Sequence, residues 1–414
     1  MKSNYRPIGD FIELVDVRNK DLRVDHLLGL SITKEFIPSV ANTVGTNMSN
    51  YKIIKKNQFA CSIMQVRRDK KMPVALLKDF DEAIISQAYP VFQVVKEEVL
   101  SPDYLMMWFS RAEFDRHACF LAVGGVRGSL EWDDFLEMEL PVPSIEKQRE
   151  IVKEYNTIVN RIKLNEQLNQ KLEETAQALY KHWFVYFEFP NENGQPYKSS
   201  GGEMVYNDAL DQELPLGWRI NELGNIIESH SKKHDFVKDE LIFFNTSDIL
   251  NGDFLHSNYS DVAGMPGQAK KSIRKNDILY SEIRPANKRF ALVRIDAEDY
   301  VVSTKLMVLR VIVSKINHLR IYQFLTYPKF INKLQRAAEG RSGTFPQITF
   351  EEHLENHPFI IGSEDIESRF LKFLTANYSQ FFSRRDENRI LAQMKGVILS
   401  KMSKVEYRKT EEVL

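Results

Sequence analysis

The order of sequence signals in this chain repeats once, with an offset of about 215–221 positions. Each copy opens on a short apolar segment, IGDFIE at 8–13 and LGNIIE at 223–228. Each continues through a basic, strand-like run and a Gly/Ser turn, and each ends in a long charged segment with helical periodicity. Two similar units in one chain tend to pack with pseudo-two-fold symmetry. The repeat therefore predicts two related globular domains.

Composition excludes several classes of protein. A chain of 414 residues that is 43% hydrophobic can bury the cores of two or three domains. The net charge of −1 excludes a uniformly basic nucleic-acid coat, so only local patches could bind nucleic acid. Cys61 and Cys119, the two cysteines, indicate neither a disulfide scaffold nor a structural zinc site. Because we find no signal peptide and no run of about 18 apolar residues, we expect a cytoplasmic chain without membrane contact.

The distribution of strand and helix signals favours an α+β fold. Strand candidates rich in β-branched and aromatic residues alternate irregularly with short helices, without the repeating pattern of a doubly wound sheet. Pro, Gly, Asn and Ser concentrate between the two copies, as in a linker. The expected parts are a domain at 1–143, a long helix at 144–187, a linker at 188–217, a second domain at 218–362, a second long helix at 363–405 and a tail at 406–414.

Both long helices carry the 3.5-residue period of a coiled coil. Ser144 follows Pro141 and Pro143 and is a good N-cap for the first helix. Apolar residues then step by four and three, and polar residues interrupt the middle of each stripe. We expect the two helices to pair antiparallel; alternatively, each helix packs on its own domain. The expected seam residues are Ile151, Tyr155, Ile158, Ile162, Asn165, Asn169, Leu172, Leu179 and Trp183 in the first helix, and Phe370, Phe373, Leu391, Met394 and Ile398 in the second.

Two matched basic segments predict contact with phosphates. Residues 51–78 and 267–294 each contain eight Lys and Arg residues and at most two acids. Arg and Lys also recognise guanine edges, and Asn and Gln recognise adenine. The Gly/Ser turns at 123–129 and 338–344 each carry an Arg that could approach a DNA phosphate, although an ordinary tight turn remains the alternative. The candidate DNA-binding residues are Gln65, Arg67, Arg68, Lys70, Lys71, Arg127, Lys270, Lys271, Arg284, Asn287, Lys288, Arg289 and Arg341.

The chain shows no catalytic or metal-binding motif. It lacks a phosphate-binding Walker loop, a dinucleotide fingerprint and the Asn-Pro-Pro-aromatic signature of methyltransferases. His353 and His357 are spaced by four residues, but Pro358 follows directly, which favours a structural role over zinc binding. The acidic run at 131–139 is interpreted as a solvated face. The sequence therefore indicates a binding protein or a scaffold rather than an enzyme, with an unrecognised nuclease site as a third alternative.

Three segments carry a resemblance to a known family. LPVPSIEKQREIV at 140–152 combines a Pro-rich strand end with a Glu-x-Gln helix start, HWFVYFEFP at 182–190 precedes the linker, and KNDILYSEIRPANKRFALV at 275–293 forms a strand–loop–strand segment. With these motifs the chain resembles the specificity (S) subunit of Type I restriction–modification systems over essentially its whole length. The second helix start, HPFIIGSEDIESRFL at 357–371, departs from the pattern because it lacks the second proline and the glutamine.

The resemblance implies a function. Two target-recognition domains would each recognise one half of a split, asymmetric site in double-stranded DNA, and the helix pair would set the unread gap. Similar proteins bind two methyltransferase (M) subunits and restriction/translocase (R) subunits. S-adenosylmethionine and ATP are then expected on those partners, and no cofactor, metal or catalytic residue on this chain. The alternative is a coiled-coil interaction scaffold without sequence-specific DNA recognition.

Overall fold

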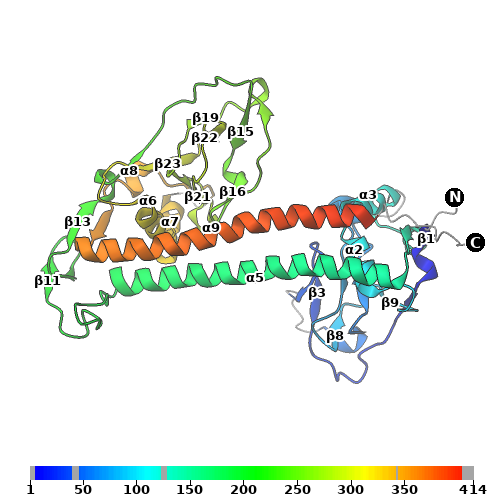
Figure 1. Ribbon diagram of the computed structural model, residues 1–414. Helices are drawn as coiled ribbons and strands as arrows, with labels where there is room; N and C mark the ends of the chain where they lie inside the picture. The colour runs from blue at the N-terminus through cyan, green and yellow to red at the C-terminus, as the bar shows by residue number, and fades with distance from the viewer. Residues whose placement is uncertain (1–4, 40–45, 123–127, 342–343, 403–414) are drawn as a thin grey trace, which may run out of the picture. The chain divides into compact units, whose positions relative to one another are not determined.

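The computed structural model describes residues 5–39, 46–122, 128–341 and 344–402 (Figure 1). The chain forms two compact units. Unit 1 comprises residues 1–166 and 385–414, and unit 2 comprises residues 167–384. Each unit contains one globular domain and one portion of each long helix. Since the boundaries between units fall inside the helices, they do not test the predicted domain limits, which stay predictions.

Unit 1 is built on a four-stranded antiparallel sheet with the order β2-β9-β6-β7. The strands are β2 (Ile12–Leu14), β9 (Val91–Val94), β6 (Phe59–Cys61) and β7 (Val74–Leu76). A second ladder pairs β5 (Lys52–Lys55) with β8 (Glu82–Ile85), and β1 (Tyr5–Pro7) pairs with β10 (Glu139–Pro141). The helices α2 (Pro102–Phe109) and α3 (Ala112–Leu121) cover the core, where Phe109 contacts the stacked rings of Phe59 and Phe92. Burial of these apolar residues is the main force that holds the unit together.

Unit 2 repeats this topology. Its main sheet has the order β14-β23-β20-β21, made of β14 (Ile227–Ser229), β23 (Leu306–Val311), β20 (Ile278–Ser281) and β21 (Phe290–Leu292). The outer pairs are β13 (Arg219–Glu222) with β24 (Pro358–Ile361), and β19 (Ala269–Ser272) with β22 (Tyr300–Ser303). The helices α6 (His318–Leu325) and α7 (Pro328–Arg341) stand where α2 and α3 stand in unit 1. The predicted α+β class and internal repeat are therefore confirmed.

Shorter elements complete both units, and unit 2 carries additional strands. β15 (Glu240–Phe244) extends the β19–β22 ladder by pairing parallel to β22 and antiparallel to β18 (Ser260–Asp261). The other elements are η1 (Ile8–Asp10), β3 (Leu28–Leu30), β4 (Phe36–Pro38), η2 (Met48–Asn50), α1 (Val66–Asp69), α4 (Trp132–Glu137), β11 (Met204–Asn207), β12 (Gln212–Pro215), η3 (Leu223–Asn225), η4 (Thr246–Asp248), β16 (Ile249–Leu250), β17 (Asp253–Phe254), η5 (Val262–Gly264), η6 (Pro285–Asn287) and α8 (Phe350–His353). In the described part of the chain, no helix combines the length and apolarity that crossing a bilayer requires.

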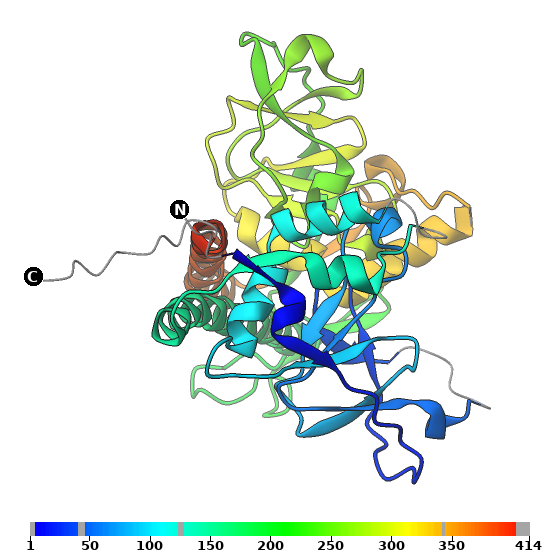
Figure 2. The ribbon, with the colours of Figure 1, turned by 90° about the vertical axis from the view of Figure 1, so that its right-hand side faces the viewer.

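The two long helices, α5 (Ile145–Phe184) and α9 (Glu364–Lys401), lie side by side and antiparallel within each unit (Figures 1 and 2). In unit 1, Arg161 of α5 pairs with Glu387 of α9 at 2.8 Å. In unit 2, the Asn377 side chain donates to the Leu172 carbonyl at 3.1 Å, and the Phe184 and Phe370 rings lie 4.9 Å apart. In these pairs the residue number rises along α5 as it falls along α9, which shows that the helices are antiparallel. At about 1.5 Å per residue, the 40 residues of α5 extend over about 60 Å.

Burial along the helices agrees with the predicted seam on α5 but only in part on α9. Every predicted α5 seam residue is buried or half-buried. On α9, Met394 is 49% exposed, so its place in the seam was predicted wrongly. Residues outside the predicted stripe, including Leu374, Tyr378 and Phe381, are buried instead against the domain of unit 2. Contacts with the globular domain determine which residues of α9 are buried, and a strict heptad pattern does not predict them all. Packing of each helix on a domain, the alternative considered above, therefore operates together with pairing.

One side chain near the start of each long helix anchors it to the adjacent domain. Gln148, fully buried, accepts from the Ser101 N–H and donates to the carbonyls of Val99 and Pro143. At the corresponding helix position in α9, Glu367 accepts from the Gly362 N–H and from Arg320 at 3.1 Å. The second copy therefore replaces a glutamine anchor by a carboxylate–guanidinium anchor, which explains physically how its helix start can lack the glutamine.

Candidate nucleic-acid interface

Two short, strained turns occupy the same position in the two units. Turn 1 (residues 65–70) contains α1 and connects toward β7 after β6, and turn 2 (residues 284–288) contains η6 and connects β20 to β21. Each turn is flanked by non-glycine residues in the left-handed region: Gln65 (φ 62°) and Lys70 (φ 53°) in turn 1, Arg284 (φ 45°) and Lys288 (φ 53°) in turn 2. Such a conformation costs about 1 kcal/mol or more per residue and clusters at functional sites. Its occurrence at both ends of both turns makes them the strongest candidates for a binding role.

The side chains that these turns present to solvent are mostly cationic. Arg67, Arg68 and Lys70 are exposed in turn 1, and Lys71 follows directly; Gln65 is half-buried. Arg68 pairs with Asp69 at 2.7 Å, yet its side chain remains 64% exposed. Turn 2 exposes Arg284, Asn287 and Lys288. Guanidinium, ammonium and amide groups on a projecting turn can bond phosphate oxygens and base edges.

Residues at or just after the end of each predicted Gly/Ser turn contact turn 1 or turn 2. In unit 1, the Arg67 N–H donates to the Gly128 carbonyl at 3.1 Å. Gly128 has φ +74°, and a Cβ atom there would lie 2.8 Å from the Arg67 Cβ, so this approach requires glycine. In unit 2, the Arg284 N–H donates to the Pro346 carbonyl at 3.2 Å, and its guanidinium lies 3.4 Å from the Thr344 carbonyl. The described contacts thus come from Gly128 in unit 1 and from Thr344 and Pro346 in unit 2. Of the second predicted Gly/Ser turn, residues 338–341 form the end of α7 instead, so that part of the prediction was wrong.

Several predicted residues do not fit a DNA-contacting role. The Lys271 ammonium is half-buried and donates to the Leu306 carbonyl at 2.8 Å, and burial lowers its pKa. Arg289 donates to the carbonyls of Ser247 and Ile249, both at 3.0 Å. Because both cations are used to hold backbone within unit 2, we remove Lys271 and Arg289 from the candidate set.

The remaining candidates lie apart from the turns or outside the described residues. Arg341 is exposed but forms an ion pair with Glu352. Lys270 is exposed on β19, whose chain leads to the beginning of β20, whereas turn 2 follows the end of β20. The second basic segment is therefore divided between the two ends of one strand and does not form a single patch. Arg127 lies outside the described residues.

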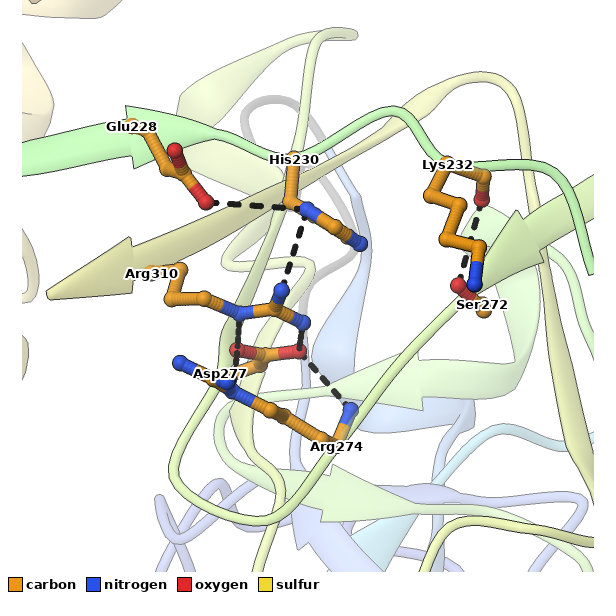
Figure 3. A network of polar contacts seen from close by, with 7 residues as sticks. All are labelled: Glu228, His230, Lys232, Ser272, Arg274, Asp277 and Arg310. Atoms are coloured by element: carbon orange, nitrogen blue, oxygen red, sulfur yellow. Dashed lines mark hydrogen bonds and ion pairs between the residues drawn. The ribbon is translucent and has the colours of Figure 1, made fainter. Parts of the chain in front are cut away.

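A buried ion-pair network supports the end of β20 opposite turn 2 (Figure 3). The Nε and Nη2 atoms of Arg310, on β23, each donate to one carboxylate oxygen of Asp277 at 2.8 Å. Asp277 also accepts from the Arg274 N–H at 2.8 Å, and the Arg310 Nη1 lies 3.0 Å from the His230 Nδ1. The hydrogen bonds to Asp277 raise the pKa of Arg310. The network joins β14, β20 and β23, so we assign it a structural role.

The helix pair has a polar middle, as its sequence predicts. In unit 1, the buried Asn165 donates to Glu387 at 2.9 Å and to Asn388 at 2.8 Å. In unit 2, Asn169 and Asn377 are also buried. Polar groups in an apolar seam lower stability, and the hydrogen bonds that Asn165 and Asn377 donate favour the observed register, because a shift would break them. The register of the two helices is therefore defined within each unit.

The described residues contain no group of three or more His, Cys, Asp or Glu side chains able to hold a metal ion. His353 accepts from the Thr349 N–H at 3.3 Å, and His357 stacks on Phe330 with ring centroids 4.9 Å apart. Burial, and secondarily the charge of Lys333, lowers the pKa of His357 to about 4. Both histidines therefore have structural contacts in unit 2.

Sequence reasoning missed the side chains that hold the turns from behind. Asp115 on α3 accepts from the Met72 N–H at 3.1 Å and pairs with the buried Lys34 at 2.8 Å. Gln335 on α7 accepts from the Ala286 N–H at 3.0 Å. Neither residue lies near its turn in the sequence, and a lone Asp or Gln on an amphipathic helix carries no signal of such a contact.

Sequence comparison with known proteins gives a family match and similar relatives. The family described as "Type I restriction modification DNA specificity domain" matches residues 6–174 and 215–383. The HindI specificity subunit of Haemophilus influenzae is 44% identical over 135 residues, which cover 32% of this chain and 29% of that protein. The MjaIX specificity subunit of Methanocaldococcus jannaschii is 23% identical over 316 residues, 75% of this chain and 69% of that protein.

A solved structure shares the fold. The crystal structure of the Type I restriction–modification S subunit from M. genitalium has a TM-score of 0.55 at 14% identity, covering 96% of this chain and 95% of that one. The family match occurs once in each half of the chain and together spans most of its length. The chain therefore belongs to the family of Type I restriction modification DNA specificity domains.

Proposed function

We propose that this chain is the non-catalytic DNA-specificity subunit of a Type I restriction–modification complex. Turn 1 and turn 2 each recognise one half of a bipartite, asymmetric DNA site. The observation that carries the proposal is the duplication of a strained turn at the same topological position, with exposed Arg and Lys side chains and with one Arg N–H bonded to a carbonyl outside the turn. A strained, positioned turn favours recognition, since simple electrostatic attraction requires no fixed geometry.

The antiparallel helix pair sets the gap between the half-sites in this proposal. Its 40-residue α5 is about 60 Å long, close to two DNA turns of about 34–36 Å each. Deleting one heptad from each helix removes about 10 Å, or about three base pairs. We expect a shorter unread gap or loss of activity in such a variant. A functional variant with an unaltered gap would refute the ruler mechanism.

The catalytic activities belong to partners. Two M subunits would bind the helix pair and carry S-adenosylmethionine for adenine methylation, and R subunits would carry ATP-dependent translocation and cleavage. This division agrees with the sequence, which has no methyltransferase or phosphate-binding motif. DNA methylated in cells that carry this chain and its M subunit should then show a gapped, two-part motif.

Variants that each lose two charged side chains test turn 1 and turn 2, which are called the reading turns below. Arg284→Ala with Lys288→Ala should abolish recognition of one half-site, and Arg67→Ala with Lys70→Ala should abolish recognition of the other. Lys198→Ala with Arg219→Ala, a loss of two exposed charges that lie neither on turn 2 nor on α7, is the control. If each turn residue contacts one phosphate, each turn variant should reduce the slope of log K against log salt by about two. Methylation of an unchanged motif by both turn variants would contradict the proposal.

A coiled-coil scaffold without DNA recognition remains the second candidate, supported by the long helix pair itself. It predicts that any affinity of the complete chain for DNA is weak and independent of sequence. It also predicts that the turn variants leave assembly and activity unchanged.

A further inference from the structure

In each unit, one acceptor side chain of the second domain helix bonds a backbone N–H in the reading turn or just after it. Gln335 of α7 accepts from the Ala286 N–H inside turn 2 at 3.0 Å. Asp115 of α3 accepts from the Met72 N–H, just after turn 1, at 3.1 Å. We propose that Gln335 and Asp115 are positioning residues, each of which sets the base preference of one half-site without touching DNA. The inference rests on the proposed function and deepens it.

In turn 2 the orientation of the Gln335 amide is itself fixed. Its Nε2 donates to Glu339 at 2.8 Å, which directs Oε1 toward Ala286. From the other side, Pro346 accepts from the Arg284 N–H. The backbone is therefore restrained at two places inside the strained turn. Base recognition needs donors held within about 0.5 Å of their productive positions, which two such restraints can provide.

In unit 1 the helix α3 contacts turn 1 near its start and the chain just after its end. The Cys119 thiol lies 3.4 Å from the Val66 carbonyl, and Asp115 accepts from the Met72 N–H two residues after the turn. Asp115 is fixed in turn by Lys34, whose side chain is 8% exposed and also donates to the Phe109 carbonyl. The two units thus use different residues, a carboxylate and an amide, for the same task on the same helix of the repeat.

A positioning role and a general loss of stability predict different effects on DNA binding. Loss of the acceptor leaves the exposed cations of the turn in place, so non-specific binding and its salt dependence should not change. Discrimination between bases should fall, because the donors become mobile. Partial unfolding would instead weaken specific and non-specific binding together.

The experiment compares Gln335→Leu with Glu339→Ala in the full chain assembled with its methyltransferase partner. The probes are duplexes that carry the methylation motif of the wild-type complex, or single-base changes in one half. Loss of one hydrogen bond should lower discrimination by about fivefold in one half only, with an unchanged salt slope. Glu339→Ala keeps the Oε1 acceptor but removes the group that orients it, so its loss of discrimination should be smaller than that of Gln335→Leu and confined to the same half. Unchanged discrimination, or an equal loss in both halves, would overturn the assignment. A wild-type complex without a gapped motif would instead refute the proposed function.

The matching test in unit 1 must avoid leaving Lys34 buried without its partner. Lys34→Met with Asp115→Asn removes the ion pair but keeps the Oδ1 acceptor, and should retain discrimination. Lys34→Met with Asp115→Leu removes the acceptor too and should lose about fivefold in the other half-site. Both double variants should unfold at similar temperatures. Equal discrimination by the two would overturn the role of Asp115.

Discussion

Replacing Arg310 by Met tests whether the ion pair of Figure 3 supports unit 2. The Asp277 side chain is 1% exposed and that of Arg310 is 11% exposed, and two hydrogen bonds of 2.8 Å join them. Removal of one partner from a buried pair leaves the other charge uncompensated and costs about 3–5 kcal/mol. Arg310→Met should therefore lower the free energy of unfolding of unit 2 by that amount.

A double-mutant cycle separates the ion pair from lost packing. Asp277→Asn with Arg310→Met replaces the charged pair by neutral groups of similar size, so it should recover most of the stability that Arg310→Met loses. We expect a coupling energy of about 2–3 kcal/mol. Hydrogen exchange, measured separately for β20 and β23 of unit 2 and for β6 and β9 of unit 1, provides the assay and an internal reference. A loss below about 1 kcal/mol, or additive effects of the two changes, would refute the reasoning.

Other predictions concern unit 2 as well. The folded state holds the pKa of His357 at about 4, below its usual value, so the unfolded state binds more protons between about pH 6.5 and 4. The free energy of unfolding should therefore fall as the pH falls through this window, by about 1–2 kcal/mol after solvent screening. Denaturant unfolding of His357→Phe should lack that part of the acid sensitivity. Phe370→Ala should cost about 3–5 kcal/mol in the same assay, since its fully buried ring packs on Trp183 and Phe184. Arg289→Met should cost about 0.5–1.5 kcal/mol by removing its hydrogen bonds to two partly solvated backbone carbonyls, whereas Arg284→Met should leave stability within about 0.5 kcal/mol.

The sequence was sufficient for the repeat, the α+β class and the long helices, because each depends on periodicity or on signals close together in the chain. Ser144 and the apolar steps that follow it predict a helix within a residue of the observed start of α5 at Ile145. Met394 was misassigned because a heptad pattern describes a helix that meets one partner, whereas α9 meets both a helix and a globular domain.

The reading turns were predicted only in part. Clustered charge identified the basic segments, but it could not distinguish the roles of two arginines five residues apart. Arg284 is exposed to solvent, whereas Arg289 donates to backbone carbonyls. That distinction depends on the left-handed conformations at both ends of turn 2, which the sequence does not signal at Arg and Lys. The Gln335 contact joins residues far apart in the chain and likewise needs the tertiary fold.

Unit 1 is built from both ends of the chain, and this affects how it folds during translation. Leu399 and Met402, near the end of the described chain, belong to the same buried core as Tyr104 and Phe109. Residues 167–384 are translated in between, which takes on the order of 10–40 seconds at about 5–20 residues per second. The second unit is contiguous and can therefore complete its core on the ribosome first, while the N-terminal domain waits with an uncovered apolar surface. A premature stop codon near position 385 should accordingly harm the domain encoded first.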